Sequence, residues 1–166
     1  FKHVFHKGSD KINHEGDLVG MSGPNNAPGL YIAPDTNELV IVMNTFDSIN
    51  EKISIDDIPM KKWVCVIIQC TGRNLDVFIN GKLNKVGSKH IAAPEMVFDE
   101  LVLGPDGGFD GYTAKFLYFD GPTNPQEAWN IYRQGFSSGG IGNIFEKYKI
   151  KISFLEDNHE QGSLEI

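Results

Sequence analysis

Two aspartates in a glycine-rich stretch are the residues best suited to hold a metal ion. Asp106 and Asp110 lie four positions apart in residues 104–111, whose sequence is GPDGGFDG. Hard cations such as Ca²⁺ are bound by carboxylate and carbonyl oxygens, which a loop of this kind can supply. Aspartates in turns also bond to their own backbone, so a plain turn is the alternative. We expect no cofactor other than calcium.

The histidines and cysteines do not show the spacing of a zinc site. The five histidines are scattered along the chain, at His3, His6, His14, His90 and His159. Zinc sites need Cys or His ligands in closely spaced groups, and no such group occurs. In a regular strand His3 and His6 would also point to opposite faces, because successive side chains alternate. We therefore expect no zinc site.

Acidic pairs for glycoside hydrolysis are equally hard to find. That reaction needs two carboxylates held about 5–9 Å apart across a cleft. Glu15 and Asp17 come nearest, but Gly16 separates them and the segment is predicted to be a loop. Phosphate-binding and dinucleotide-binding glycine patterns do not occur either. The sequence predicts that the chain is not an enzyme.

The two cysteines lie in one apolar run, residues 63–70. Cys65 and Cys70 are five positions apart, so a strand would separate them by about 16 Å and point them to opposite faces. A disulfide needs Cα atoms within about 7 Å, so they cannot bridge each other. There is also no Asn-X-Ser/Thr site. Both features favour a reducing compartment over secretion.

The elements that position all these residues are predicted to be short strands. Glycine (18) and proline (8) are frequent among the 166 residues, and they separate runs of strand-forming residues. No strand–helix–strand rhythm appears, which excludes a parallel Rossmann-type sheet. The spacing predicts a sandwich or barrel. The expected strands are 3–7, 29–33, 38–45, 50–55, 63–70, 74–80, 82–86, 100–104, 111–119 and 146–155.

Two local sequence patterns predict specific structures, a hairpin turn and a short helix. Asn80-Gly81 between two strand runs predicts a tight hairpin, because both residues tolerate positive φ. Asn124, Pro125 and Gly135 predict the cap, first turn and end of one short helix. We expect ten residues to point inward or to make contacts between the sheets: Trp63, Val64, Val66, Ile68, Val77, Ile79, Leu101, Leu103, Phe116 and Tyr118.

The C-terminal part alternates strictly between apolar and basic residues. The lysines Lys147, Lys149 and Lys151 share one face of the predicted strand, opposite Tyr148, Ile150, Ile152 and Phe154. A lysine row is either a solvated outer face or a docking surface for an acidic partner. The acidic tail, residues 156–166, is expected to be mobile or ordered by a partner.

The net charge limits the kinds of partner that the chain is expected to bind. Fifteen basic and 22 acidic residues give a charge of −7, and an acidic surface repels nucleic acid. The longest uncharged stretch, residues 18–34, is broken by glycine, proline and asparagine, so no membrane span is expected. The chain begins at Phe1 inside a predicted strand. Contact with a membrane is therefore expected only through an anchor upstream of Phe1.

The order of these features resembles that of the laminin-G-like, concanavalin-A-like β-sandwich domains. The resemblance implies an all-β fold: an antiparallel jelly-roll sandwich over residues 1–135, with one short C-terminal helix and its first strand upstream of Phe1. Residues 136–166 would then be a linker, an added C-terminal strand and the acidic tail. The matching pieces are residues 3–8, 28–32, 38–41, 58–63, 75–83, 101–104, 108–111, 115–119 and the helix around Trp129.

Within this family the chain is similar to laminin-G-like proteins of large DNA viruses, which are often virion components. The resemblance implies a non-catalytic structural module that contacts other protein subunits in a virion or cytosolic assembly. A lectin-like module is the alternative, with Phe109, Tyr112 or Trp129 stacking on a glycan and Asp106 or Asp110 near calcium. A glycoside hydrolase is the third possibility, although the acidic motif of the family's glucanases is missing.

Overall fold

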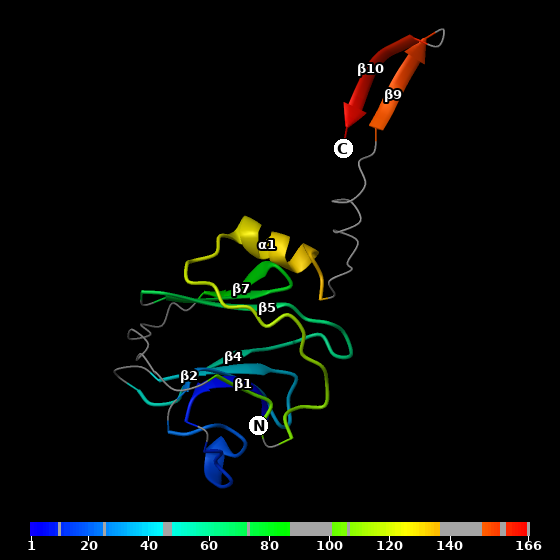
Figure 1. Ribbon diagram of the computed structural model, residues 1–166. Helices are drawn as coiled ribbons and strands as arrows, with labels where there is room; N and C mark the ends of the chain where they lie inside the picture. Colours follow the sequence, from blue (N-terminus) through cyan, green and yellow to red (C-terminus); the bar gives the residue numbers. More distant parts are fainter. Residues whose placement is uncertain are drawn as a thin grey trace.

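The computed structural model is mainly β. It contains two antiparallel sheets, of five and three strands, together with one short helix and a two-stranded C-terminal hairpin. The two larger sheets face each other, and the helix covers the outer side of the three-stranded sheet (Figure 1). The structure describes residues 1–9, 11–24, 26–44, 48–72, 74–86, 101–105, 107–136, 151–156 and 159–165.

The five-stranded sheet has the order β4-β3-β2-β1-β8. Its first four strands pair with their neighbours in sequence, and β8 is added beside β1. Every residue of β3 is buried, because both faces of the sheet are covered. The strands are β1 (Lys2–Gly8), β2 (Asn26–Ile32), β3 (Leu39–Met43), β4 (Glu51–Ile55) and β8 (Leu101–Leu103).

The three-stranded sheet is a meander of β5 (Val66–Thr71), β6 (Asn74–Ile79) and β7 (Lys82–Val86). The predicted Asn-Gly hairpin is confirmed: Asn80 and Gly81 join β6 to β7 with φ angles of 51° and 74°. The Asn80 side chain has a further role, since its Oδ1 accepts a hydrogen bond of 2.9 Å from the Cys65 backbone N–H. The turn thereby also fixes the entry to β5.

The main core lies between the two sheets. Of the ten core residues expected from the sequence, Val77 is fully buried and Val64, Val66, Ile68 and Ile79 are half-buried. The other five are exposed by 40% or more and do not belong to this core, although Leu101 and Leu103 lie in β8: Trp63, Leu101, Leu103, Phe116 and Tyr118. The buried cluster is formed by Leu30, Leu39, Ile41, Met43, Ile55, Leu75 and Val77.

A second, smaller core covers the outer face of the five-stranded sheet. The segment 11–24, which includes the short 3₁₀ helix η1 (Gly16–Leu18), folds over that face and buries Met21. Met21 packs with Tyr31, Val40 and Val42 from the sheet. Strands β2 and β3 are apolar on both faces for this reason. We call the segment 11–24 the cover segment.

The helix α1 (Pro125–Arg133) forms as predicted. Asn124 Oδ1 accepts a hydrogen bond from the Glu127 N–H, and Glu127 Oε2 accepts one from the Asn124 N–H, each at 2.9 Å. This reciprocal capping box satisfies two donors at the helix start. Gly135, with φ of 70°, follows the helix and ends it. Within the described residues no helix is both long and apolar enough to cross a membrane.

Residues 111–119 do not form the predicted strand. They run as an extended but unpaired segment along the side of the two sheets, and Lys115 interrupts them with a φ of 50°. A strand needs a neighbour that accepts its backbone hydrogen bonds, and no described strand pairs with this segment. Phe116 of this segment contacts Phe5, with ring centroids 5.0 Å apart.

The C-terminal strand is confirmed in part. Strand β9 (Lys151–Glu156) covers the second half of the predicted strand, whose residues 146–150 lie outside the described residues. The tail, expected to be mobile or ordered by a partner, instead contains β10 (His159–Glu165), which pairs with β9. This hairpin is a sheet of its own among the described strands.

Candidate functional site

A bulge in β1 brings two histidines to the same face of the sheet. His3 pairs with Tyr31 and Phe5 pairs with Leu30, so Val4 is an extra residue between them. A bulge of this kind shifts the alternation of side chains by one position. The expectation that His3 and His6 point to opposite faces was therefore wrong. Both lie on the outer face, under the cover segment.

The two imidazoles form a buried hydrogen-bonded pair. His3 Nε2 and His6 Nδ1 are 2.6 Å apart, and the ring planes are almost perpendicular, at 86°. The side chains of His3 and His6 are 2% and 0% exposed. The Tyr31 ring stands edge-on to His3, with centroids 5.1 Å apart. A hydrogen bond between two imidazoles requires a proton on one nitrogen and a lone pair on the other.

Burial keeps the side chains of His3 and Tyr31 uncharged at neutral pH. Desolvation and, to a smaller extent, the neighbouring His6 together lower the pKa of His3 from 6.5 to about 4, although a hydrogen bond with the Val4 backbone opposes the shift. Desolvation also raises the pKa of the Tyr31 hydroxyl to about 12, although a hydrogen bond from the Ser22 backbone opposes that shift. Neutral groups can share protons here without the cost of a buried charge.

The Tyr31 hydroxyl connects the cluster to the cover segment. It accepts a hydrogen bond of 3.0 Å from the Ser22 N–H and donates one of 2.6 Å to Asn26 Oδ1. The Asn26 amide donates in turn to the Ser22 carbonyl at 2.7 Å and to Asn50 Oδ1 at 3.1 Å. Gly29 leaves room for these groups, because a Cβ there would stand 2.5 Å from Asn26 Oδ1. The buried polar groups therefore hold the segment and sheet together.

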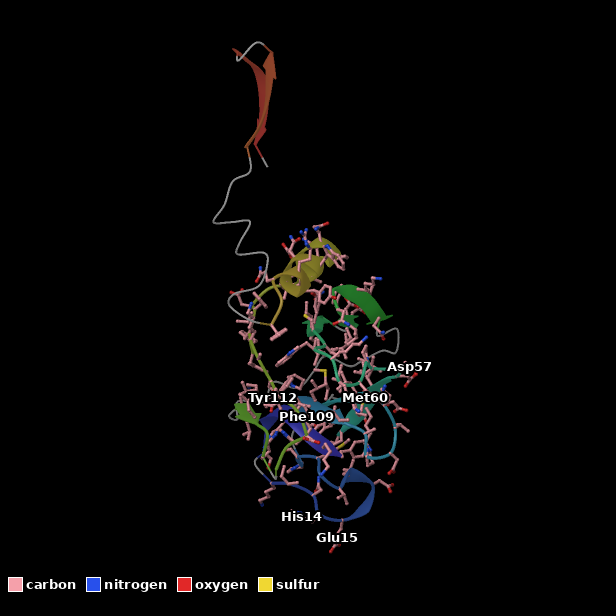
Figure 2. The ribbon with its side chains drawn as sticks, turned by 90° about the vertical axis from the view of Figure 1, so that its right-hand side faces the viewer. His14, Glu15, Asp57, Met60, Phe109 and Tyr112 are labelled. Atoms are coloured by element: carbon pink, nitrogen blue, oxygen red, sulfur yellow. The ribbon has the colours of Figure 1, made fainter. Side chains whose placement is uncertain are left out.

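A hollow of about 280 Å³ opens beside His3. Its polar lining comes from Lys2, His3, Asn13 and His14, and its apolar lining includes Val19. His14 itself is exposed and lies at the far end of the cover segment, beside Glu15 and away from the sheets (Figure 2). Of the two paired histidines, His3 is the one that lines the hollow.

The C-terminal hairpin is a second candidate site. Residues directly opposite each other in an antiparallel pair share a face. Ile152 pairs with Leu164, and Phe154 pairs with Gly162, so these positions form an apolar face. The neighbouring pairs, Lys151 with Glu165 and Ser153 with Ser163, form a polar face. Near the turn the pattern changes, because Leu155 pairs with Glu160 on the second face and Glu156 pairs with His159 on the first, so the apolar positions of the first face are 152, 154 and 164.

The structure does not bring the three predicted sugar-stacking residues together. Phe109 is half-buried and Tyr112 is 87% exposed, and both lie at the level of the five-stranded sheet (Figure 2). Trp129 is on α1, at the outer side of the other sheet, where it contacts Tyr132 with centroids 5.4 Å apart and covers the turn at Gly81. A single glycan platform made of all three is excluded by this separation.

The predicted ionic sites lie largely outside the described residues. This holds for Asp106, Lys147 and Lys149, whereas Asp110 is exposed. In the described part of the chain no three His, Cys, Asp or Glu side chains gather as metal ligands would. Cys65 and Cys70 are free thiols, as expected, and burial raises the pKa of both.

Comparison with protein families, with curated proteins and with solved structures gives no match. The function therefore has to be argued from the two sites of this chain: the buried histidine cluster and the C-terminal hairpin.

Proposed function

We propose that the chain is a non-catalytic interaction module, which docks onto another protein subunit of a larger assembly through its C-terminal hairpin. The observation that carries the proposal is the register of β9 and β10, which gathers Ile152, Phe154 and Leu164 on one face. We further propose that the two facing sheets belong to a concanavalin-A-like jelly roll, as the sequence resemblance implies, and that the assembly is a virion or cytosolic complex.

The argument for docking is energetic. A two-stranded hairpin alone in water is marginally stable at best, and it needs further strands or a packed face. Covering each large apolar side chain contributes about 1.5–3 kcal/mol. The three apolar positions together would contribute enough to order the hairpin on a partner. The Lys151–Glu165 pair belongs to the opposite face by register.

Hydrogen exchange tests this proposal. The amides of residues 151–165 should exchange rapidly in the isolated chain and should be protected in the assembly purified from its source. Phe154→Ser should prevent incorporation into the assembly. Ser153→Ala, on the polar face of the same strand, is the matched control and should incorporate normally. Equal protection of the hairpin in both states would show that it is not the docking element.

Carbohydrate binding is a second candidate, favoured by one observation. Tyr112 is 87% exposed, and it lies close in sequence to Phe109 and Asp110 on one turn at the surface. An exposed aromatic ring suits the face of a sugar, and an exposed carboxylate two residues away in sequence could accept hydrogen bonds from its hydroxyls. A glycan array with and without calcium tests this function. Binding should be lost in Tyr112→Ala, and no binding at high protein concentration would exclude it.

A further inference from the structure

The strand β7 lies at an edge of the three-stranded sheet, with β6 as its neighbour among the described strands. It is five residues long, and its sequence, KLNKV, contains two lysines and no acidic residue. An edge strand presents a row of backbone N–H and C=O groups to which a further strand can be added. Strand addition at such an edge is a common mode of protein recognition.

We propose that β7 is the docking site for the C-terminal hairpin of a second copy of this chain, with β10 of one copy pairing along β7 of the other. The inference rests on the proposed function, in which the hairpin docks onto another subunit, and it names that subunit and its surface. The hairpin would extend the three-stranded sheet to five strands, and a hairpin is stabilised by such neighbours.

The charges of the two strands are complementary. β10 contains Glu160 and Glu165 and neither lysine nor arginine, whereas β7 contains Lys82 and Lys85. Lysines on an edge strand oppose its pairing with a like strand, so two copies of β7 would repel each other. The same lysines attract an acidic strand, and the charges therefore select β10 as the partner.

The register within the sheet places both lysines of β7 on one face. Val77 and Ile79 of β6 pack in the main core between the two sheets. Lys85 pairs with Val77, and Lys82 pairs with Ile79. Because directly paired residues share a face, the two lysines belong to the core side of the sheet at its edge.

Leu83 belongs to the other face, the side that α1 covers. It pairs with Phe78, which alternates with the core residues of β6, and it is 46% exposed. Trp129 and Tyr132 of α1 border the turn before β7, since a Cβ at Gly81 would stand 3.0 Å from the Trp129 Cα and 3.1 Å from the Tyr132 Cβ. Both aromatic side chains are 37% exposed, so apolar surface lies beside β7 on this face.

The hairpin has the same combination of faces. Glu160 and Glu165 share one face by register, and Ile152, Phe154 and Leu164 lie on the other. When the glutamates of β10 lie on the lysine side of β7, the apolar positions of the hairpin fall on the side of Leu83 and α1. One orientation of the hairpin therefore satisfies the charges and the apolar surfaces together.

The partner is a second copy because the hairpin does not pair with β7 of its own chain. It forms a sheet of its own among the described strands and stands apart from the two larger sheets (Figure 1). Two copies that exchange their hairpins form a closed dimer with two identical contacts.

Light scattering on the full 166-residue chain tests this pairing. The natural chain should form a dimer that dissociates on dilution. The variants K82E/K85E, in β7, and E160K/E165K, in β10, each bring like charges together, so each should raise the dissociation constant at least tenfold. An equimolar mixture of the two variants should dimerise again, because both contacts of the mixed dimer then join opposite charges. This recovery also shows that neither variant is misfolded.

The matched control is K61E/K62E, which reverses two exposed lysines in the turn before β5 and should dimerise as the natural chain does. A natural chain that stays monomeric at high concentration would overturn the inference. So would a dimer that K82E/K85E leaves unchanged, or a mixture of the two variants that does not associate.

The proposed function is tested separately by Phe154→Ser in the assembly purified from its source. If this variant fails to incorporate while the natural chain alone is monomeric, the hairpin docks onto a different protein. The proposed function then holds and the partner named here is wrong. A monomer whose hairpin amides are protected from exchange would show docking within one chain, which contradicts both.

Discussion

The ring of Trp63 is stacked on the ring of Phe136, with centroids 4.2 Å apart and planes inclined by 12°. Trp63 lies just before β5 and Phe136 lies just after α1, so the stack joins the start of the three-stranded sheet to the end of the helix that covers it. Both side chains are nearly half exposed, at 45% and 49%. Trp63 is therefore part of a surface contact and not of the core between the sheets.

This stack predicts a moderate effect of Trp63→Ala. The free energy of unfolding should fall by about 1–2 kcal/mol, less than the roughly 3–5 kcal/mol lost when a buried tryptophan is truncated. A double-mutant cycle with Phe136→Ala, followed by urea denaturation, should give a coupling energy of about 0.5–1.5 kcal/mol. A coupling energy near zero would mean that the two rings do not interact in solution.

Replacing Gly29 by alanine is a small change, but we expect it to lower the free energy of unfolding by as much as Trp63→Ala or more. An added Cβ would stand 2.5 Å from Asn26 Oδ1 and 2.6 Å from Tyr31 Cε2, both of which are fixed in the buried polar network. Overpacking of this kind typically costs 1–3 kcal/mol, so we expect Gly29→Ala to lower the free energy of unfolding by roughly that amount. Gly121→Ala is the control, since a Cβ there meets nothing within 4 Å. Similar melting temperatures for the two variants would contradict the packing around Tyr31.

Much of the fold follows from local rules that the sequence displays. Turn residues such as Asn80-Gly81 and the cap at Asn124 act through their own backbone, so they were predicted with their roles. The buried strand β3 likewise follows from a continuous apolar run, residues 39–43. Strands β5 and β6 were found at the expected places, although β5 begins at Val66 and not at Trp63.

The candidate site was harder to predict, because it depends on long-range register. No glycine or proline marks the one-residue bulge at Val4 in the sequence. Without this bulge, His3 and His6 would be on opposite faces of the sheet. The pairing of β10 with β9 was also missed, because the tail is polar and its strand depends on its neighbour. Residues 111–119 show the reverse: their composition favours a strand, but no described strand is positioned to pair with them.

The hairpin turn beneath α1 gives a further prediction. Gly81 has a φ of +74°, and a Cβ there would stand 3.0 Å from the Cα and Cε3 atoms of Trp129. Gly72 also has a positive φ, +59°, but a Cβ there meets nothing within 4 Å. Both alanine variants should lose about 1 kcal/mol from backbone strain. Gly81→Ala should lose measurably more in chemical denaturation, because α1 must also shift. Equal losses would show that the helix does not rest on this turn.

The stability of the whole chain should fall in mild acid because His3 is buried in its neutral form. Its pKa is about 4 in the folded chain and 6.5 in the unfolded chain, so the unfolded state binds more protons between those two values. Stability therefore rises with pH across this window, and it is lost as the pH falls below 6.5.

From pH 7.5 to pH 5.0 this linkage should remove about 2 kcal/mol from the free energy of unfolding. Urea denaturation at the two pH values measures the loss, and few carboxylates become protonated in this range. In His3→Gln the loss should shrink to a fraction of its value, whereas in His14→Gln it should match that of the natural chain, because His14 is exposed. If His3→Gln retained the full loss, the acid sensitivity would have to come from another group, and the neutral burial of His3 would not account for it.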